Sequence, residues 1–266
     1  MKNCLTIAGS DCSAGAGIQA DIKAMSACGV YAMSVITSVV AENTSRVVSV
    51  YDLPDEVIKQ QIDAVFEDIY VDGVKIGMIK SPSIMQAVAE KLKQYSPCNV
   101  VADPVMSAKD GCALMDEAAL AVLKNEIIPA CTLLTPNIPE AELIAQMKID
   151  SQRDMMQCAK KIYAMGCGAV LVKGGHYGGM PIDILYDGNG FYKYSSPRIN
   201  TKNTHGTGCT LSSAITAFLA KGNSIQQSVL LGKRYVYNAI KNSLEIGKGH
   251  GPLHHFYDYY SMKGFE

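Results

Sequence analysis

The sequence predicts an α/β fold: a mostly parallel central sheet with helices on both faces and a small antiparallel hairpin at one edge. Short apolar runs rich in β-branched residues alternate with longer amphipathic segments, which is typical of repeated strand and helix units. Polar or glycine-rich residues follow several of these runs, as they do at the ligand-binding edge of open α/β sheets. The segment 183–196 reads as two strands around Asp187-Gly-Asn-Gly190, a strong turn signal, and supplies the hairpin.

The expected strands are these apolar runs, because strands buried on both faces of a sheet read as continuous hydrophobic stretches. They fall in chain order at 4–8, 31–41, 48–51, 74–79, 99–102, 132–134 and 169–172, ahead of the hairpin.

The expected helices begin at residues suited to a helix amino terminus. Ser81 precedes Pro82, and Ser224 stands three residues before Gln227 in a capping-box pattern. Helices are expected after the glycine-rich turn 9–21 and at 54–69, 82–95, from 151 onward, 207–221 and 224–244. The helix at 207–221 is apolar on most faces and should be nearly buried.

Length and charge bound the kind of protein. The 266 residues, 48% of them hydrophobic, suffice for one large domain with a substantial core, which we expect to span residues 1–266. Lys and Arg number 24 against 25 Asp and Glu, a net charge of -1, so nothing favours nucleic acid or an acidic membrane surface. The expected partner is a small molecule.

The cysteines and the apolar runs indicate the compartment. Nine cysteines form no Cys-x-x-Cys pair and lie beside no clustered histidines, which favours reduced thiols over a disulfide framework or a zinc site. The amino terminus carries too short an apolar run for a signal peptide. The longest apolar region, 31–41, falls well short of the roughly 20 residues of a membrane span. We expect a soluble, cytoplasmic protein.

An anion site is predicted at Asn200–Leu211, where a glycine-bracketed turn precedes an apolar helix. Gly206 and Gly208 allow the amide groups around Thr207 to converge at the positive end of the helix dipole, where a phosphate fits. Cys209 follows on the first turn and can face whatever carries the anion. The spacing does not match the Walker pattern, which disfavours a P-loop nucleotidase. The alternative is a plain tight turn with Cys209 as a small buried residue.

Further candidates follow the expected strands, at the usual ligand side of the sheet. Each has an alternative: Glu42 as a solvated loop residue, Met78 as core, and Asp103 as the cap of a turn rather than a magnesium site. Asn137 and Glu140 could flank metal-bound phosphates. Lys173, followed by two glycines, suits neutralisation of phosphate charge, whereas His176 is expected to take no part.

Six motifs in order carry a resemblance to a known family. They are Ala-Gly-Ser-Asp-Cys-Ser-Ala-Gly-Ala-Gly-Ile-Gln-Ala-Asp, Lys-Ile-Gly-Met, Asp-Pro-Val-Met, Thr-Pro-Asn-Ile-Pro-Glu, Val-Lys-Gly-Gly-His and Asn-Thr-Lys-Asn-Thr-His-Gly-Thr-Gly-Cys-Thr. The chain resembles bacterial hydroxymethylpyrimidine/phosphomethylpyrimidine kinases over nearly its whole length. The resemblance implies a ribokinase-like three-layer sandwich that forms a homodimer and uses ATP with Mg²⁺. It also implies phosphorylation of 4-amino-5-hydroxymethyl-2-methylpyrimidine, a thiamine precursor, and then of the monophosphate.

The resemblance also implies roles for individual residues. The pyrimidine should contact Ala16, Glu42, Met78, Val105 and Cys209, while Gly206, Thr207 and Gly208 form the anion hole for the transferred phosphoryl group. Asn137, Glu140, Lys173 and Thr207 fall on nucleotide positions, and Asp103 and Glu140 on metal positions that act through water. Most ribokinase-like sugar kinases carry an aspartate base where Cys209 stands, so we expect Cys209 to be the base, as a thiolate favoured by the helix amino terminus.

Two departures from the family pattern matter. Glu42 stands where glutamine is usual and can only accept hydrogen bonds, so the substrate must supply the protons through an exocyclic amine and a protonated ring nitrogen. We therefore expect Glu42 to keep the substrate preference but to make the affinity depend on pH. Ala14 stands where glycine is common and should stiffen the first loop.

Two other functions stay open. A related branch with the same cysteine phosphorylates pyridoxal, but its phenolic oxygen would face the Glu42 carboxylate as a second acceptor. A precursor-binding sensor would not need the charged groups at Asp103 and Lys173 together with the anion hole. A requirement for a monovalent cation is not decided by the sequence.

Overall fold

The computed structural model describes residues 1–106, 115–175 and 180–264, and its strands form one nine-stranded sheet. The strand order is β3-β2-β1-β4-β5-β6-β7-β8-β9. The strands are β1 Asn3–Asp11, β2 Tyr31–Glu42, β3 Val47–Asp52, β4 Gly73–Ile76, β5 Val100–Ala102, β6 Leu133–Leu134, β7 Val170–Val172, β8 Ile182–Tyr186 and β9 Phe191–Ser195.

The middle of the sheet is parallel, and both edges are antiparallel. Strands β2, β1, β4, β5, β6 and β7 run in one direction, and β8 and β9 form the predicted hairpin beside β7. The antiparallel pairing of β3 with β2 was not predicted. Its reason is the short connection 43–46, because so few residues can join neighbouring strands only as a hairpin.

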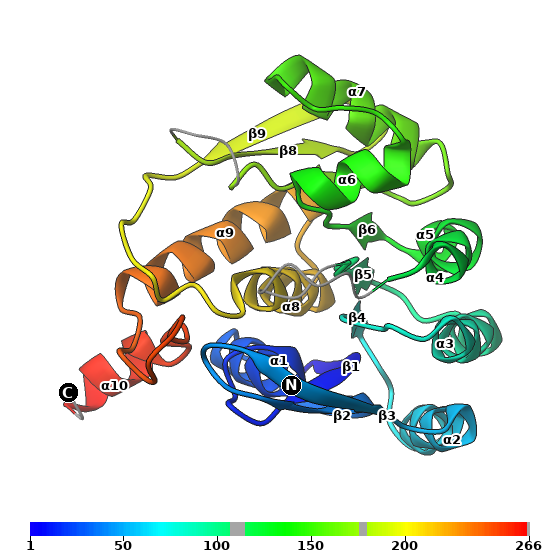
Figure 1. The fold of residues 1–266 in the computed structure, drawn as a ribbon, viewed down its shortest axis with the longest axis horizontal. Helices are drawn as coiled ribbons and strands as arrows, with labels where there is room; N and C mark the ends of the chain where they lie inside the picture. Colours follow the sequence, from blue (N-terminus) through cyan, green and yellow to red (C-terminus); the bar gives the residue numbers. More distant parts are fainter. Residues whose placement is uncertain (107–114, 176–179, 265–266) are drawn as a thin grey trace.

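Helices cover both faces of the sheet (Figure 1). The helices α1, α8 and α9 lie on one face, and α2 to α7 lie on the other. Their bounds are α1 Gly17–Ala27, α2 Asp55–Phe66, α3 Pro82–Tyr95, α4 Glu117–Val122, a π-helical turn Leu123–Ile127, α5 Ile128–Ala130, α6 Ile138–Ala145, α7 Gln152–Tyr163, α8 Thr207–Ala220, α9 Ile225–Lys241 and α10 Tyr257–Lys263.

Side-chain caps fix several helix starts where the sequence predicted them. The Ser81 hydroxyl accepts from the amide of Ile84 at the start of α3. Ser224 accepts from the Gln227 amide at the start of α9, which is one half of the predicted capping box. Helices α2 and α9 end three residues earlier than expected, at Phe66 and Lys241.

Two helical regions were missed. The segment from Glu117 to Ala130 is helical with a π turn at Leu123–Ile127, just before Pro129, whose nitrogen cannot donate to a regular helical ladder. Helix α10 lies in the tyrosine-rich tail and buries none of its own residues. In the first segment the buried residues Ala119, Val122, Leu123, Ile127 and Ile128 recur at helical spacing, which is the signal that could have predicted it.

Helix α8 is the central helix of its face, as expected. Ten of its 14 residues are buried. It packs against α1 and α9 and across β1, β4 and β5. Its amino end lines a cavity together with residues that follow β4, β5 and β7, so it lies at the carboxyl ends of the parallel strands. Among the described residues, no helix combines the length and the apolar character needed to cross a membrane.

Candidate active site

The glycine-bracketed turn at the start of α8 is shaped by close contacts. Gly206 caps the helix with φ +81°, a left-handed conformation, and a Cβ there would lie 1.9 Å from the carbonyl oxygen of Gly15. A Cβ on Gly208 would lie 3.1 Å from Asp103 Oδ2 and 3.6 Å from Lys173 Nζ. The turn is thus packed against the first loop on one side and against a charged pair on the other.

Two cavities meet at this turn. The first, here called the Glu42 cavity, has a volume of about 290 Å³. Its wall includes every residue to which the sequence assigned a site role: Ala16, Glu42, Met78, Asp103, Val105, Asn137, Glu140, Lys173, Gly206, Thr207, Gly208 and Cys209. Met78 reaches it because β4 ends at Ile76, earlier than predicted, and leaves Met78 beyond the strand.

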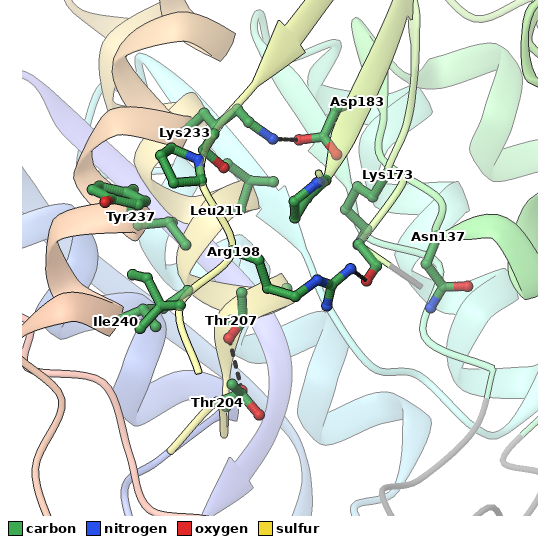
Figure 2. Close-up of a pocket in the computed structure, with 17 residues that line it drawn as sticks. Asn137, Lys173, Asp183, Arg198, Thr204, Thr207, Leu211, Lys233, Tyr237 and Ile240 are labelled. Carbon is green, nitrogen blue, oxygen red and sulfur yellow. Dashed lines mark hydrogen bonds and ion pairs between the residues drawn. The ribbon is translucent and has the colours of Figure 1, made fainter. Parts of the chain in front are cut away.

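The second cavity, here called the Tyr237 cavity, has a volume of about 330 Å³. Leu211, Val236, Tyr237 and Ile240 form an apolar side, and Asp183, Arg198 and Lys233 supply charge (Figure 2). The two cavities share five lining residues: Asn137, Lys173, Thr204, Thr207 and Gly208. A group held at that common wall can be reached from both sides.

The sequence did not single out Asp183, Arg198 or Lys233, three of the charged residues of the Tyr237 cavity. Arg198 donates to the carbonyl oxygen of Gly175 at 3.2 Å and extends across the cavity toward Lys173 (Figure 2). Lys233 pairs with Asp183 at 2.5 Å, and Asp183 also accepts from the Gly174 amide at 2.9 Å. Arg198 lies only two residues before the predicted anion segment, which is the one signal that pointed to it. His176, expected to take no part, lies outside the described residues.

Lys173 is the cation of the common wall. Its Nζ lies 2.6 Å from Asp103 Oδ1, which also accepts from the Thr135 hydroxyl at 3.2 Å. Burial works against the charged lysine, but the carboxylates of Asp103 and Glu140 outweigh it and raise its pKa. Lys173 therefore carries a full positive charge beside the amino end of α8.

Glu140 combines a structural role with an unusual charge state. It forms a capping box with Asn137: its carboxylate accepts from the Asn137 amide at 2.7 Å, and the Asn137 side chain accepts from the Glu140 amide at 2.9 Å. Burial raises the pKa of Glu140 to about 7, and the attraction of Lys173 reduces this rise only in part.

Asp103 and Glu140 suit a hard cation. Both are buried carboxylates on the wall of the Glu42 cavity, and Asp103 Oδ2 faces the Gly208 backbone. Carboxylate oxygens are the donors that Mg²⁺ prefers, commonly through its own water shell. A cation between them would also relieve the unfavourable charge that keeps the pKa of Glu140 high.

Cys209 does not have the charge state that the sequence suggested. Burial raises the pKa of its thiol to about 11, even though the Lys75 ammonium and the Gly17 amide, which donates to the sulfur, both act to lower it. The expectation of a thiolate held by the helix end is wrong for the protein without ligands. A helix terminus contributes about 0.3–1 kcal/mol, and the loss of hydration on burial exceeds it.

Asp11 and His205 belong to the site and were not predicted as site residues. Asp11 Oδ1 accepts from the amide and hydroxyl of Ser13, and Oδ2 accepts from the amides of Gly15 and Ala16 and lies 3.0 Å from His205 Nε2. Burial opposes the Asp11 charge, but these hydrogen bonds, led by that of His205, hold its pKa well below the usual value. Asp11 lies in the glycine-rich turn 9–21 and His205 in the segment Asn200–Leu211. Their place in these two motifs is the signal that could have identified them as site residues.

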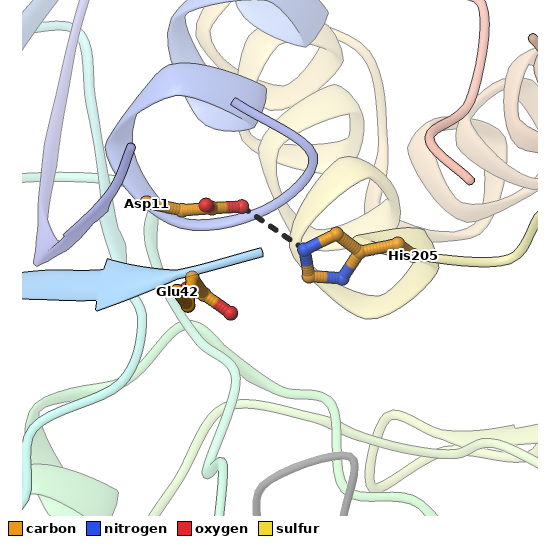
Figure 3. A group of neighbouring side chains, drawn as sticks. All are labelled: Asp11, Glu42 and His205. Atoms are coloured by element: carbon orange, nitrogen blue, oxygen red, sulfur yellow. Dashed lines mark hydrogen bonds and ion pairs between the residues drawn. The ribbon is translucent and has the colours of Figure 1, made fainter. Parts of the chain in front are cut away.

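Asp11, Glu42 and His205 bring three potential metal ligands within 4.8 Å of one another (Figure 3). Five donors already occupy the oxygens of Asp11, so the geometry favours a structural link between two loops over metal coordination. The backbone of Glu42 is held in turn by Cys12, whose sulfur donates to the Glu42 carbonyl at 3.1 Å.

Ala14 occupies the position where a glycine is common in the resembling family. Its φ is +61°, in the left-handed region that L-residues rarely adopt. The first loop therefore contains a residue held in a less favourable conformation.

Comparison with known proteins supports one family. The family described as phosphomethylpyrimidine kinase matches residues 11–254. The chain is 46% identical over 254 residues to the hydroxymethylpyrimidine/phosphomethylpyrimidine kinase of Bacillus subtilis, covering 95% of this chain and 94% of that protein. It is also 46% identical to the thiamine biosynthesis bifunctional protein of Geobacter sulfurreducens, over 94% of this chain but only 51% of that protein, about half of its length.

Solved structures share the fold over nearly the same range. The phosphomethylpyrimidine kinase of Clostridium difficile is similar with a TM-score of 0.82 and 48% identity, covering 90% of this chain and 100% of that one. The pyridoxal kinase of Bacillus subtilis, in its ADP complex, has a TM-score of 0.89 and 35% identity, covering 96% and 98%. These neighbours confirm the predicted ribokinase-like sandwich. On the match of residues 11–254, which include all of the Glu42 cavity wall except Gly9 and Ser10, the chain belongs to the phosphomethylpyrimidine kinase family.

Proposed function

We propose that the protein transfers the γ-phosphoryl group of ATP to the hydroxymethyl group of 4-amino-5-hydroxymethyl-2-methylpyrimidine and then to the resulting monophosphate, in thiamine biosynthesis. The observation that carries the proposal is the common wall of the two cavities. That wall joins the amino end of α8 to the Lys173 ammonium, so an acceptor in one cavity and a phosphate donor in the other meet at one cationic point.

ATP occupies the Tyr237 cavity in this proposal. Val236, Tyr237 and Ile240 offer an apolar wall for the adenine ring. The phosphates extend toward the common wall, where Asn137, Lys173 and Thr207 contact them. Asp103 and Glu140 would hold Mg²⁺, and the ion would supply charge neutralisation on the phosphate oxygens.

The pyrimidine occupies the Glu42 cavity. Ala16, Met78 and Val105 line the ring, and the Glu42 carboxylate accepts hydrogen bonds from the exocyclic amine and a protonated ring nitrogen. The hydroxymethyl group then points toward Cys209. In this orientation the exocyclic amine donates to the Glu42 carboxylate. A ring with a phenolic oxygen at that place would present a second acceptor instead.

The transfer step needs one proton acceptor. The thiol form of Cys209 predominates at neutral pH, and a thiol cannot accept a proton. Cys209 must therefore first lose its own proton to solvent. As the alcohol oxygen bonds to phosphorus, its proton passes to the Cys209 sulfur, and the bond between phosphorus and the ADP oxygen breaks. The amides of Gly206, Thr207 and Gly208 and the Lys173 ammonium stabilise the charge on the phosphoryl group in transit.

The second phosphorylation makes a different demand. The nucleophile is then a phosphate oxygen of the monophosphate, which is already anionic near neutral pH because its second pKa is about 6. It needs no base, so Cys209 serves mainly the first step.

The assay that tests the function measures ADP release by the purified protein with ATP and Mg²⁺. The expected result is turnover with the hydroxymethylpyrimidine and with its monophosphate, and much weaker turnover with pyridoxal. Turnover with pyridoxal alone would instead support the pyridoxal kinase, which the high TM-score of 0.89 keeps as the second candidate. Tight pyrimidine binding without ADP release would support a sensor. The same assay in potassium-free buffer decides the question of a monovalent cation.

We further propose that residues 1–266 form a single kinase domain that acts in the cytoplasm as a homodimer. Apolar side chains exposed near the β3 edge of the sheet support association: Tyr31, Val39, Val48 and Tyr51 are 50–67% exposed. Light scattering after gel filtration should give twice the chain mass of 28.6 kDa. A monomer over the working concentration range would contradict the dimer.

A further inference from the structure

A buried ion pair that the proposed mechanism does not use lies beneath the active site. Lys75, on β4, places its Nζ 2.7 Å from Asp21 Oδ2 on α1, and the side chains of both residues are 0% exposed. Burial works against the lysine charge, but Asp21 outweighs it and raises the pKa of Lys75. A buried ion pair is weak evidence for stability, since apolar residues of similar size often serve as well. This pair therefore needs another reason.

Hydrogen bonds connect the pair to the helix that carries Cys209. Asp21 Oδ1 accepts from the Ser213 hydroxyl at 2.8 Å. Ser213 follows Cys209 by four residues on α8, so the two side chains lie on the same face of the helix, one turn apart. Asp21 is thereby fixed next to the turn on which the Cys209 sulfur lies.

The Lys75 ammonium lies toward the cavity end of its strand. A Cβ placed on Gly77 would come within 2.4 Å of Lys75 Nζ, so the side chain runs along the strand to the residue just beyond its end. The next residue, Met78, lines the Glu42 cavity together with Cys209. Lys75 thus brings a positive charge under the floor of that cavity without being exposed in it.

Four charged residues on four elements act on Cys209. They are Lys75 on β4, Asp21 on α1, Asp103 after β5 and Lys173 after β7. Lys75 is the leading attraction for a negative sulfur, whereas Asp21 and Asp103 oppose one.

We propose that Lys75 is a positioning residue that stabilises the thiolate of Cys209, and that Asp21 holds the Lys75 ammonium in place and moderates its effect. The inference rests on the proposed role of Cys209 as the base. When the sulfur loses its proton to water, its negative charge forms beside a fixed positive charge in a poorly hydrated place. The thiolate then takes the alcohol proton as described above. The pair accounts for how a half-buried cysteine can serve where related kinases have a carboxylate.

The test measures the rate at which iodoacetamide alkylates Cys209, as a function of pH, without ATP or metal. The thiolate attacks the carbon, a sulfur–carbon bond forms and iodide leaves, so the rate reports the thiolate fraction. Mass spectrometry of the Cys209 peptide separates this signal from the exposed Cys12 and Cys98.

The two partners should shift the rate in opposite directions. Lys75→Met should slow alkylation at pH 8 about tenfold by raising the pKa of Cys209 by about one unit, and Asp21→Asn should speed it several-fold. Simple loosening of the site would move both variants the same way. Equal signs, or no change in either variant, would overturn the proposal.

Controls separate the charge from folding and from the proposed function. Lys75→Arg should keep a pH profile close to that of the unmodified protein. Lys91→Met, which breaks a pair of the same 2.7 Å length between α3 and α2, should leave Cys209 alkylation unchanged.

The test also holds if Lys75→Met does not fold, because slower alkylation of Cys209 in the Asp21→Asn variant would by itself contradict the inference. Because alkylation requires no turnover, the direction of each rate change can be measured independently of the kinase assay. In that assay Lys75→Met should slow the first phosphorylation and leave the second nearly unchanged.

Discussion

The two cavities that meet at the start of α8 differ in charge. The Glu42 cavity is lined by four carboxylates, at Asp11, Glu42, Asp103 and Glu140, against the two cations Arg46 and Lys173. The Tyr237 cavity has one, Asp183, against the cations Lys173, Arg198 and Lys233. An amine-bearing ring suits the first and a polyphosphate suits the second. Electrostatics can therefore sort the two substrates before any specific contact forms.

The largest expected effect is at the wall that both cavities share. Lys173→Met should lower kcat/KM about 1000-fold for both phosphorylations, because it removes the fixed positive charge on the transferred group. Steady-state kinetics with the pyrimidine and with its monophosphate measures this. A loss confined to one acceptor would mean that the two reactions do not pass through a common point.

A smaller and asymmetric effect is expected at Cys209. Cys209→Ala should lower the first phosphorylation about 100-fold, as for the loss of a general base, and change the second no more than a few-fold. Single-turnover rates with each acceptor check this ratio. Undiminished turnover of the alcohol would remove Cys209 from the mechanism. Cys98→Ala, on an exposed thiol outside both cavities, is the matched control.

Glu42 tests the negative character of its cavity. Affinity for the pyrimidine should fall as pH rises through the pKa of the ring nitrogen, because the protonated ring is the form that pairs with the carboxylate. Glu42→Gln should flatten this dependence and change the affinity about tenfold. Calorimetric titrations between pH 5.5 and about 8.5 provide the profile. The KM for ATP should not change, and an unchanged pH profile would contradict the assigned role.

The smallest expected effect is a gain in stability. The pKa of Glu140 is raised to about 7 from the value of 4.5 expected in an unfolded chain. Folding therefore becomes less favourable as pH rises from 4.5 to 7, and the loss persists above that range. Glu140→Gln keeps the capping-box acceptor but not the charge, so it should stabilise the protein by about 1 kcal/mol at pH 8 and by little at pH 4.5.

Denaturant titration at the two pH values measures the Glu140 effect. The kinase activity of Glu140→Gln should fall at the same time, because the charge that destabilises the free protein is the one proposed to hold Mg²⁺. A variant that is less stable at pH 8 would show that the carboxylate is favourably placed even without the cation.

The two cavities also differ in how far the sequence predicted them. The wall of the Glu42 cavity comes from residues directly after parallel strands, such as Asp103 after β5 and Lys173 after β7, and such ends meet at one edge in any sheet of this kind. The Tyr237 cavity is assembled by α9 and the edge hairpin. Lys233 and Asp183 are 50 residues apart in the sequence, and only tertiary packing brings them together. No local sequence pattern could therefore predict this pair.

Element types were predicted better than charge states. The parallel strands, the hairpin and the buried helix α8 follow from periodicity and capping residues. The thiol of Cys209 was assigned the wrong charge because its burial depends on α1, β4 and the strand ends together, which the sequence of one turn does not contain.

The hydrogen bond between Asp11 and His205 joins residues separated by 194 positions. A nascent chain emerging from the ribosome has β1 and its loop long before the histidine arrives. A truncated product that ends before residue 205 would lack this link, so the first loop has this restraint only when the carboxyl-terminal part of the chain is present.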